Sequence, residues 1–365
     1  MVNRRAALAF LGGAASLALT LSACGQSSEA GSASSSEGGG TVGIAMPTRA
    51  SERWLTDGKS VVEKLKGMGY KTKLVYGDDD PKAQYSQIET LVKQGVEALI
   101  IAAIDAKSLN GVLQQAADAK IPVISYDRLI LGTKNVDYYV SFDNEMVGRQ
   151  EARYIIEKLG LEKGKGPFNI EMFAGSPDDN NTKYFYNGAM ALLEEYLESK
   201  QLVVRSGETE MNKITTLRWD GATAQKRMSG LLTKWYSGRK VDAVLSPYDG
   251  ISRGVLSALK SDGYGSGSKP LPIVTGQDAE LESVKLIIAG EQSQTVYKDI
   301  RALAEAATEM VDDILTGRLP RVDNRTDYNN GVKDVPVHLL QPQSVDKTNY
   351  RMLITDGYYT AGQLR

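Results

Sequence analysis

Acidic, basic and amide side chains occur together in six short segments, most of which directly follow a predicted β-strand. The segments are "PTRASERW" (47–54), "AIDAKS" (103–108), "SYDR" (125–128), "GSPDDNN" (175–181), "SPYDG" (246–250) and "TGQDAE" (275–280). Asp accepts hydrogen bonds from hydroxyl groups, Arg and Lys donate them, and Asn does both. This combination suits a ligand with many hydroxyl groups, and Trp54, Trp219 and Tyr248 add aromatic faces on which an apolar ring face can pack.

The sequence offers little for catalysis. His338 is the only histidine, so a Ser-His-Asp or Cys-His arrangement would depend on this one residue in a Pro-flanked tail. Zinc-ligand spacings, the G-x-G-x-x-G fingerprint and the phosphate-binding P-loop do not occur, so we predict no cofactor and no metal site. Asp178 and Asp179 are adjacent, so at most one is expected to face a shared cleft. The run Asp78–Asp80 is expected to cap the helix that follows it, and we predict that the protein is not an enzyme.

The first 23 residues have the three parts of a secretion signal: two arginines, the apolar run 6–21, and small residues before Cys24. The apolar run is shorter than the ~20 residues that a membrane-spanning helix needs. "LSAC", which contains the only cysteine, resembles the lipobox of bacterial lipoproteins, and the Gly- and Ser-rich residues that follow it are typical of a flexible linker. We predict a signal peptide over 1–23 and a lipidated Cys24 with its linker over 24–40, which would tether the protein to the outer side of the bacterial cell membrane.

From Thr41 onward, short β-branched runs alternate with longer segments of helical periodicity. "ALIIAAI" (98–104) is apolar on both faces, as a central strand of a parallel sheet should be. Asp80 is predicted to be a helix N-cap, with Pro81 as the first helical residue. The alternation predicts an α/β fold of βαβ units, and about 325 residues are enough for two such domains. Ligands of such sheets bind at the carboxyl ends of the strands, close to which the polar segments lie.

Charge and hydropathy exclude several classes of partner. The chain has 43 Lys and Arg residues against 45 Asp and Glu residues, a formal net charge of −2, and no basic block that would indicate nucleic acid. No second apolar segment of membrane-spanning length follows the first. We therefore expect a globular body outside the cell. We also expect the protein to be a monomer.

Several segments together resemble the sugar-binding lipoproteins of bacterial ABC importers, in particular the xylose-binding and multiple-sugar-binding receptors. They include "VGIAMPTRASERW", "QIETLVKQGVEALIIAAID", "IPVISYDRLI", "AGSPDDNN", "VTGQDAELESVKLIIAGEQSQTVYKDI" and "LPRVDNRTDYNNG". The resemblance covers 41–365 and implies a type I periplasmic binding protein fold, in which two doubly wound lobes joined by three hinge crossovers enclose a sugar. The implied divisions are an N-terminal lobe of 41–142 plus 296–332, a C-terminal lobe of 143–295 plus 333–365, and hinges near Phe142, near Thr295 and near the C-terminus.

Motif by motif, the resemblance also implies a set of ligand-binding residues drawn from both lobes. The set is Arg53, Trp54, Asp127, Arg128, Asp179, Asn181, Trp219, Tyr248, Asp249, Asp278 and Lys298. In this reading Arg53 and Arg128 would donate to sugar hydroxyls, and Trp219 would stack on one face of the ring. Asp278 would accept from a pair of hydroxyls, and Lys298 would donate nearby.

The implied function is the capture of a monosaccharide, such as xylose, glucose, galactose or arabinose, and its delivery to an ABC permease. Tyr248-Asp249 departs from the Asn-Asp that xylose-type receptors tend to show. This difference changes the shape of the pocket, so the sequence does not identify the sugar. A sensor that presents bound sugar to a membrane kinase or chemoreceptor would use the same two lobes. A transcription regulator would need a helix-turn-helix where this chain has a secretion signal, and a glycoside-processing enzyme is disfavoured by the single histidine and the poorly placed carboxylate pairs.

Overall fold

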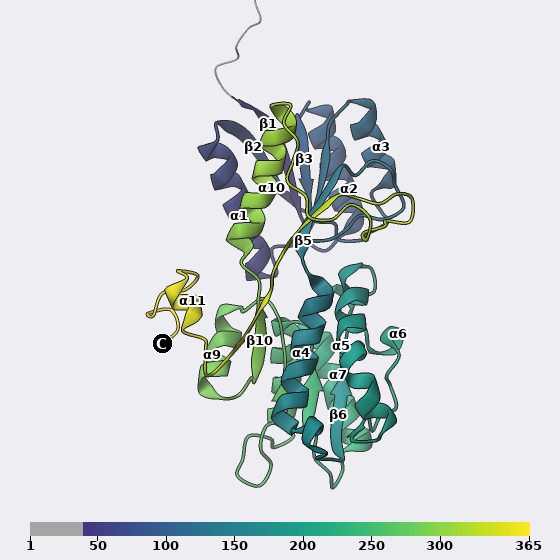
Figure 1. The fold of residues 1–365 in the computed structure, drawn as a ribbon, viewed down its shortest axis with the longest axis vertical. Coiled ribbons are helices and arrows are strands. Elements are labelled where there is room, and N and C mark those ends of the chain that lie inside the picture. Colours follow the sequence, from purple (N-terminus) through teal and green to yellow (C-terminus); the bar gives the residue numbers. More distant parts are fainter. Residues whose placement is uncertain (1–38) are drawn as a thin grey trace, which may run out of the picture. The chain divides into compact units, whose positions relative to one another are not determined.

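The computed structural model describes residues 39–365, so the predicted signal peptide and Cys24 lie outside the described part of the chain. This part contains two lobes, each built on a parallel β-sheet with helices on both faces (Figure 1). Helices and strands alternate along the sequence, which confirms the predicted α/β class. Within residues 39–365, no helix has both the length and the hydrophobicity needed to cross a membrane.

The sheet of the N-terminal lobe has the order β11-β5-β4-β3-β1-β2, and all its pairings are parallel. Its elements are β1 (Gly39–Met46), α1 (Glu52–Gly67), β2 (Tyr70–Tyr76), α2 (Pro81–Lys93), β3 (Ala98–Ile101), α3 (Asn110–Asp118), β4 (Val123–Tyr126), β5 (Tyr138–Phe142), α10 (Ile300–Leu315) and β11 (Val337–Leu340). Helices α1 and α10 cover one face and α2 and α3 the other, so β3 is fully buried, as its unbroken apolar run predicts.

Local sequence signals explain where the helices of this lobe begin. The side chain of Asp80 accepts hydrogen bonds from the backbone amides of Lys82 (2.8 Å) and Ala83 (3.3 Å), and Pro81 opens α2. These bonds satisfy two of the amides that have no partner inside a helix. The predicted N-cap is therefore confirmed.

The C-terminal lobe repeats the arrangement with the sheet order β7-β6-β8-β9, again parallel. Its elements are α4 (Asn144–Leu159), η1 (Leu161–Lys163), β6 (Phe168–Met172), α5 (Asn181–Glu198), β7 (Leu202–Val203), α6 (Met211–Ile214), η2 (Leu217–Trp219), α7 (Gly221–Trp235), β8 (Ala243–Leu245), α8 (Asp249–Ser261), β9 (Ile273–Val274), α9 (Leu281–Ala289), β10 (Gln294–Tyr297), β12 (Gln343–Asp346) and α11 (Met352–Thr355). Helices α4 and α5 cover one face of this sheet, and α7 and α8 cover the other.

In both sheets, successive strands are first added on one side of the first strand and then on its other side. The reversal lies between β1 and β3 in the N-terminal lobe and between β6 and β8 in the C-terminal lobe. A crevice opens at the carboxyl ends of the strands on either side of such a reversal, because the connecting loops diverge there. Each lobe therefore offers one polar crevice.

Three crossovers connect the lobes. The first follows Phe142 and the second follows β10. The third differs from the expected boundary at 332/333, because β11 pairs in parallel with β5 and so belongs to the N-terminal lobe. The chain crosses only after Leu340, and β12 then pairs antiparallel with β10.

Candidate ligand-binding site

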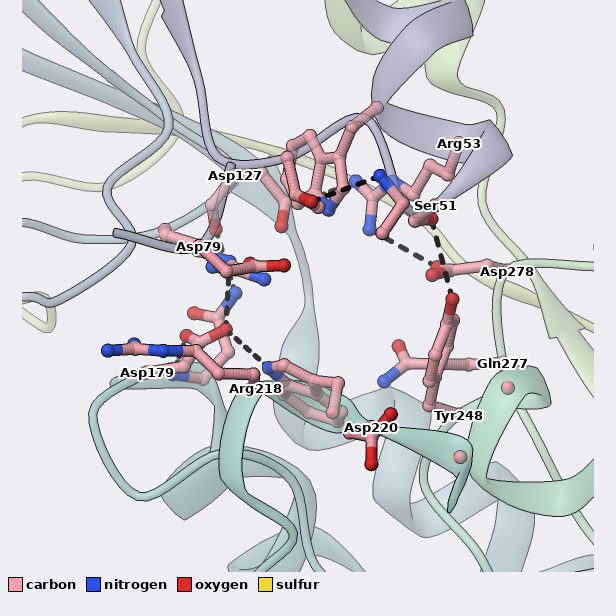
Figure 2. A pocket seen from close by; sticks show the side chains of 18 of the residues that line it. Ser51, Arg53, Asp79, Asp127, Asp179, Arg218, Asp220, Tyr248, Gln277 and Asp278 are labelled. Carbon is pink, nitrogen blue, oxygen red and sulfur yellow. Dashed lines mark hydrogen bonds and ion pairs between the residues drawn. The ribbon is translucent and has the colours of Figure 1, made fainter. Parts of the chain in front are cut away.

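A cavity of about 550 Å³ lies at the crevices of the two sheets and is lined by residues from both lobes (Figure 2). Its walls come from the loops after β1, β2 and β4 in one lobe, from the loops after β6, β8 and β9 in the other, and from Lys298 after β10. The structure brings ten of the predicted site residues together here: Arg53, Trp54, Asp127, Arg128, Asp179, Asn181, Trp219, Tyr248, Asp278 and Lys298.

Arg53, in the first turn of α1, is the most heavily paired side chain of the site. Its guanidinium donates to Asp57 (Nε to Oδ2, 3.2 Å), to Asp127 (Nη2 to Oδ2, 2.5 Å) and to Asp278 (Nη1 to Oδ1, 3.2 Å). The Nζ of Lys298 lies 2.8 Å from the same oxygen of Asp278. Arg53 and Asp278 belong to different lobes, so this buried network links the two halves of the cavity.

Arg53 and Asp127 keep their charges although they are buried. Burial lowers the pKa of Arg53, but the surrounding carboxylates, with Asp127 foremost, outweigh this and hold the pKa well above its ordinary value. Burial likewise raises the pKa of Asp127, but Arg53 and Lys298 bring it below the usual range. Asp57 does not line the cavity. Burial raises its pKa to about 6, although Arg53 and the hydroxyl of Tyr126 act to lower it. A buried ion network of this kind holds its geometry in advance of ligand binding.

A second pair of charges also joins the lobes. The Nε of Arg128, which follows β4, lies 2.9 Å from Oδ2 of Asp179, which follows β6. Burial raises the pKa of Asp179, and the facing guanidinium of Arg128 counters this only in part. Asn181 adds a neutral link, because its Nδ2 donates to the backbone carbonyl of Asp127 over 2.9 Å.

Asp127 has a backbone conformation that few non-glycine residues adopt, with φ of 60°. Three donors hold its carbonyl oxygen: the hydroxyls of Tyr139 (2.9 Å) and Ser141 (2.8 Å), and the amide of Asn181. These bonds compensate for the strain and fix the direction of the Asp127 side chain. Backbone strain of this kind is concentrated at functional sites.

Trp219 forms an aromatic wall on the side of the C-terminal lobe. Its ring contacts Phe185 and Tyr248 edge to face, with centroids 6.0 Å apart in each case, and its Nε1 donates to Oδ2 of Asp179 over 3.2 Å. A Cβ atom on Gly175 would overlap the ring, so only glycine allows this approach. The arrangement leaves the ring of Trp219 on the cavity wall.

Trp54 is expected from the sequence to present an aromatic face to the ligand, but it is mostly buried in the structure. It is 5% exposed and packs in the core of the N-terminal lobe. The guanidinium carbons of Arg53 and Arg128 lie 4.6 Å and 5.0 Å from the centre of its ring. Trp54 therefore supports the two arginines by cation–π contact as well as touching the cavity.

Tyr248 contributes its ring to the cavity, while its hydroxyl group is used elsewhere. The hydroxyl donates to Oε1 of Glu280 over 2.8 Å, and Ser51 at the start of α1 donates to the same oxygen over 3.2 Å. Arg253 completes the cluster with Nη2 2.6 Å from Oε2 of Glu280. This cluster is a further contact between the lobes beside the cavity.

Asp249 is the one predicted site residue that does not line the cavity. It is fully buried, and its carboxyl group accepts hydrogen bonds from the backbone amide of Glu280 and from Nε2 of Gln292, both at 2.8 Å. Burial, with Glu280 nearby, raises its pKa to about 8. Asp249 opens α8 with its side chain directed back toward the start of α9, so it supports the wall from behind.

The cavity also contains residues that sequence reasoning did not select. They include Asp79, Phe185, Arg218, Asp220, Arg253 and Gln277. Gln277 belongs to the polar segment "TGQDAE", and its buried Oε1 has no hydrogen-bond partner within residues 39–365. Asp79 belongs to the acidic run 78–80, which is predicted to cap α2, a role that Asp80 alone performs. A scan of the residues after β2 would have included Asp79.

The cavity combines acidic and basic side chains in equal number: Arg53, Arg128, Arg218, Arg253 and Lys298 against Asp79, Asp127, Asp179, Asp220 and Asp278. The described residues contain no group of three or more His, Cys, Asp or Glu side chains arranged to hold a metal ion. The arrangement can donate to and accept from many hydroxyl groups at once while presenting aromatic faces.

The chain is similar to known proteins over most of its length. A family model described as "Periplasmic binding protein domain" matches residues 42–319. The multiple sugar-binding periplasmic receptor ChvE of Rhizobium radiobacter is 57% identical over 327 residues, which are 89% of this chain and 92% of the receptor. The D-xylose-binding periplasmic protein of Escherichia coli K12 is 35% identical over 324 residues, 88% of this chain and 92% of that protein.

Solved structures agree with these sequence relatives. An ABC transporter solute-binding protein from Clostridium phytofermentans with bound β-D-glucose has a TM-score of 0.86 and 44% identity, and the match covers 89% of this chain and all of that chain. A carbohydrate transporter solute-binding protein from Chloroflexus aurantiacus in complex with D-glucose has a TM-score of 0.80 and 32% identity, covering 88% and 97% of the two chains. These relatives are binding proteins and not enzymes, and they share the type I periplasmic binding protein fold.

Proposed function

Because the chain belongs to the periplasmic binding protein domain family, we propose that it is an extracytoplasmic receptor that binds a neutral monosaccharide between its lobes and delivers it to an ABC permease. The observation that carries this proposal is the charge-balanced cavity with aromatic walls from Trp219 and Tyr248. An uncharged sugar both donates and accepts hydrogen bonds, so it can satisfy carboxylates and guanidinium groups together.

The size of the cavity supports a single sugar ring. Pockets for small molecules span roughly 300–1,000 Å³. The cavity of about 550 Å³ leaves room for such a ring with bridging water molecules. Arg53 and Arg128 would donate to ring hydroxyls, and Asp278 would accept from them while it stays paired with Lys298.

Binding would favour the arrangement in which both lobes contact the sugar at once. A ligand shifts a conformational equilibrium only as far as its contacts differ between the states. A sugar that touches residues of both lobes makes more contacts in the closed arrangement, because separation of the lobes removes its hydrogen bonds to one of them. The liganded arrangement would be the form that the permease recognises.

Isothermal titration of the purified protein with xylose, glucose, galactose, arabinose and ribose tests the proposal. We expect saturable binding of at least one aldose at micromolar or tighter affinity, about −8 kcal/mol or stronger. Glycerol, which has hydroxyl groups but no ring, serves as the control and should give no saturable heat. If none of the five sugars binds, the proposed ligand class is wrong.

We also propose that the mature protein is anchored to the membrane through acyl chains on Cys24. The apolar run before this cysteine and the Gly- and Ser-rich residues after it support the proposal. Radiolabelled palmitate should enter the wild-type protein in growing cells, and the Cys24→Ser variant should remain unlabelled. Equal labelling of both proteins would contradict the anchor.

The receptor is proposed to act as a monomer. The proposal is supported by a cavity that both lobes of one chain line together. Light scattering of the purified protein should therefore give the mass of one chain with and without sugar.

A further inference from the structure

The turn after β2 carries an acidic side chain into the cavity by way of an unusual backbone. Asp78 and Asp79 are consecutive and have φ values of 49° and 63°. Non-glycine residues rarely adopt this left-handed conformation, and Asp and Asn tolerate it best. The amide of Asp79 donates to the carbonyl of Pro47 over 3.0 Å, and the amide of Asp80 donates to that of Gly77, also over 3.0 Å. The turn is thus held in a strained form that directs Asp79 into the cavity (Figure 2).

Two of the carboxylates that line the cavity, Asp79 and Asp220, have no ion-pair partner among residues 39–365. Each lining cation has a carboxylate partner: Arg53 with Asp127 and Asp278, Arg128 with Asp179, Arg218 with Asp178, Arg253 with Glu280, and Lys298 with Asp278. Asp220 caps α7 by accepting from the amide and the hydroxyl of Thr223, both at 2.7 Å. Among residues 39–365, the carboxylate of Asp79 has neither an ion-pair partner nor a side-chain hydrogen bond.

We propose that Asp79 is a specificity-determining residue that selects uncharged sugars and rejects anionic ones such as hexuronates. This inference rests on the proposed function, since it concerns the choice among sugars at the same site. The free carboxylate of Asp79 can accept a hydrogen bond from a ligand hydroxyl. A ligand carboxylate would instead meet an unpaired like charge, and every cation on the wall is already neutralised, so the repulsion would not be offset.

The test compares Asp79→Asn with Asp78→Asn. Asparagine keeps the size of the side chain and tolerates positive φ, so both variants should preserve the turn. Asp78→Asn is a matched control, because it removes the same charge one residue away. The carboxylate of Asp78 is exposed, pairs with Arg49 and does not line the cavity. Affinities for D-glucose and D-glucuronate, and for D-galactose and D-galacturonate, are measured at pH 7 by isothermal titration. For a sugar that binds weakly, the affinity is measured by its displacement of a bound neutral sugar.

In the wild-type protein we expect each neutral sugar that binds to be preferred over its uronate. Asp79→Asn should reduce this preference by about tenfold or more, because removal of one like charge lowers the repulsion inside the cavity. Asp78→Asn should leave the preference unchanged to within about twofold, as is usual for an exposed charge.

Two results would overturn the role of Asp79 while leaving the proposed function intact. One is a wild-type protein that binds a uronate as tightly as the neutral sugar. The other is a preference that stays the same in the wild-type, Asp79→Asn and Asp78→Asn proteins while the neutral sugar still binds. A wild-type protein that binds neither the neutral sugars nor the uronates would instead contradict the proposed function itself.

Discussion

Replacing Arg53 by methionine is expected to lower the free energy of unfolding by about 3–5 kcal/mol and to abolish sugar binding. The side chain of Arg53 is 6% exposed and donates to Asp57, Asp127 and Asp278 at once. Methionine fills most of the same volume but leaves these carboxylates without their shared cation. Leaving a buried charge without its partner destabilises a protein far more than replacing both members of the pair by apolar residues.

The loss of stability should depend on pH. With Arg53 in place, the pKa of Asp127 lies below its usual range, so folding favours its ionised form. Without the cation, burial dominates and the pKa values of the carboxylates rise in the folded state. A carboxyl group with a raised pKa in the folded protein destabilises it as pH increases. The decrease in the free energy of unfolding caused by Arg53→Met should therefore be larger at pH 8 than at pH 5.

Denaturant unfolding of the wild-type and variant proteins at both pH values measures these effects. Arg49→Met is the control, because it removes an exposed arginine whose one carboxylate partner, Asp78, is also exposed. That substitution should cost less than about 1 kcal/mol. If Arg53→Met costs no more than Arg49→Met, or if it binds sugar normally, the central role of Arg53 is wrong.

Asp278→Asn is expected to weaken sugar binding by roughly 100-fold without unfolding the protein. One oxygen of Asp278 accepts from both Arg53 and Lys298, and Lys298 is 2% exposed, near the rings of Phe142 and Phe185. The neutral amide leaves the cation of Lys298 without a carboxylate and removes a strong acceptor for sugar hydroxyls. Asparagine tolerates the φ of 91° at this position, so the backbone should remain.

Isothermal titration with the sugar that binds the wild-type protein gives the affinity of this variant, and thermal unfolding checks that it is folded. Asp249→Asn provides the control on the neighbouring buried acid that does not line the cavity. Because the pKa of Asp249 is about 8, this substitution changes little charge at neutral pH. The affinity of the control should stay within about threefold of the wild type. An unchanged affinity in Asp278→Asn would remove Asp278 from the site.

The sequence was sufficient to predict the fold class and the edge of each sheet where the site lies. Alternation of β-branched runs with helical segments requires parallel sheets, and parallel strands place all their carboxyl ends at one edge. Five of the six polar segments, those after β1, β4, β6, β8 and β9, contribute residues to the cavity, whereas the segment 103–108 after β3 contributes none. Ten of the eleven predicted residues line the cavity. Asp80 was also predictable, because capping depends only on neighbouring residues.

The tertiary structure alone decided which of two adjacent side chains faces the cavity. Asp249 and Asp79 show this: the first turns back toward the start of α9, and the second reaches the cavity through left-handed backbone. The sequence likewise gave no signal that β11 pairs with β5, because strand pairing joins residues about 200 positions apart. Side-chain direction after a strand is set by local φ and ψ together with packing against distant elements, and neither is encoded in the spacing of residue types.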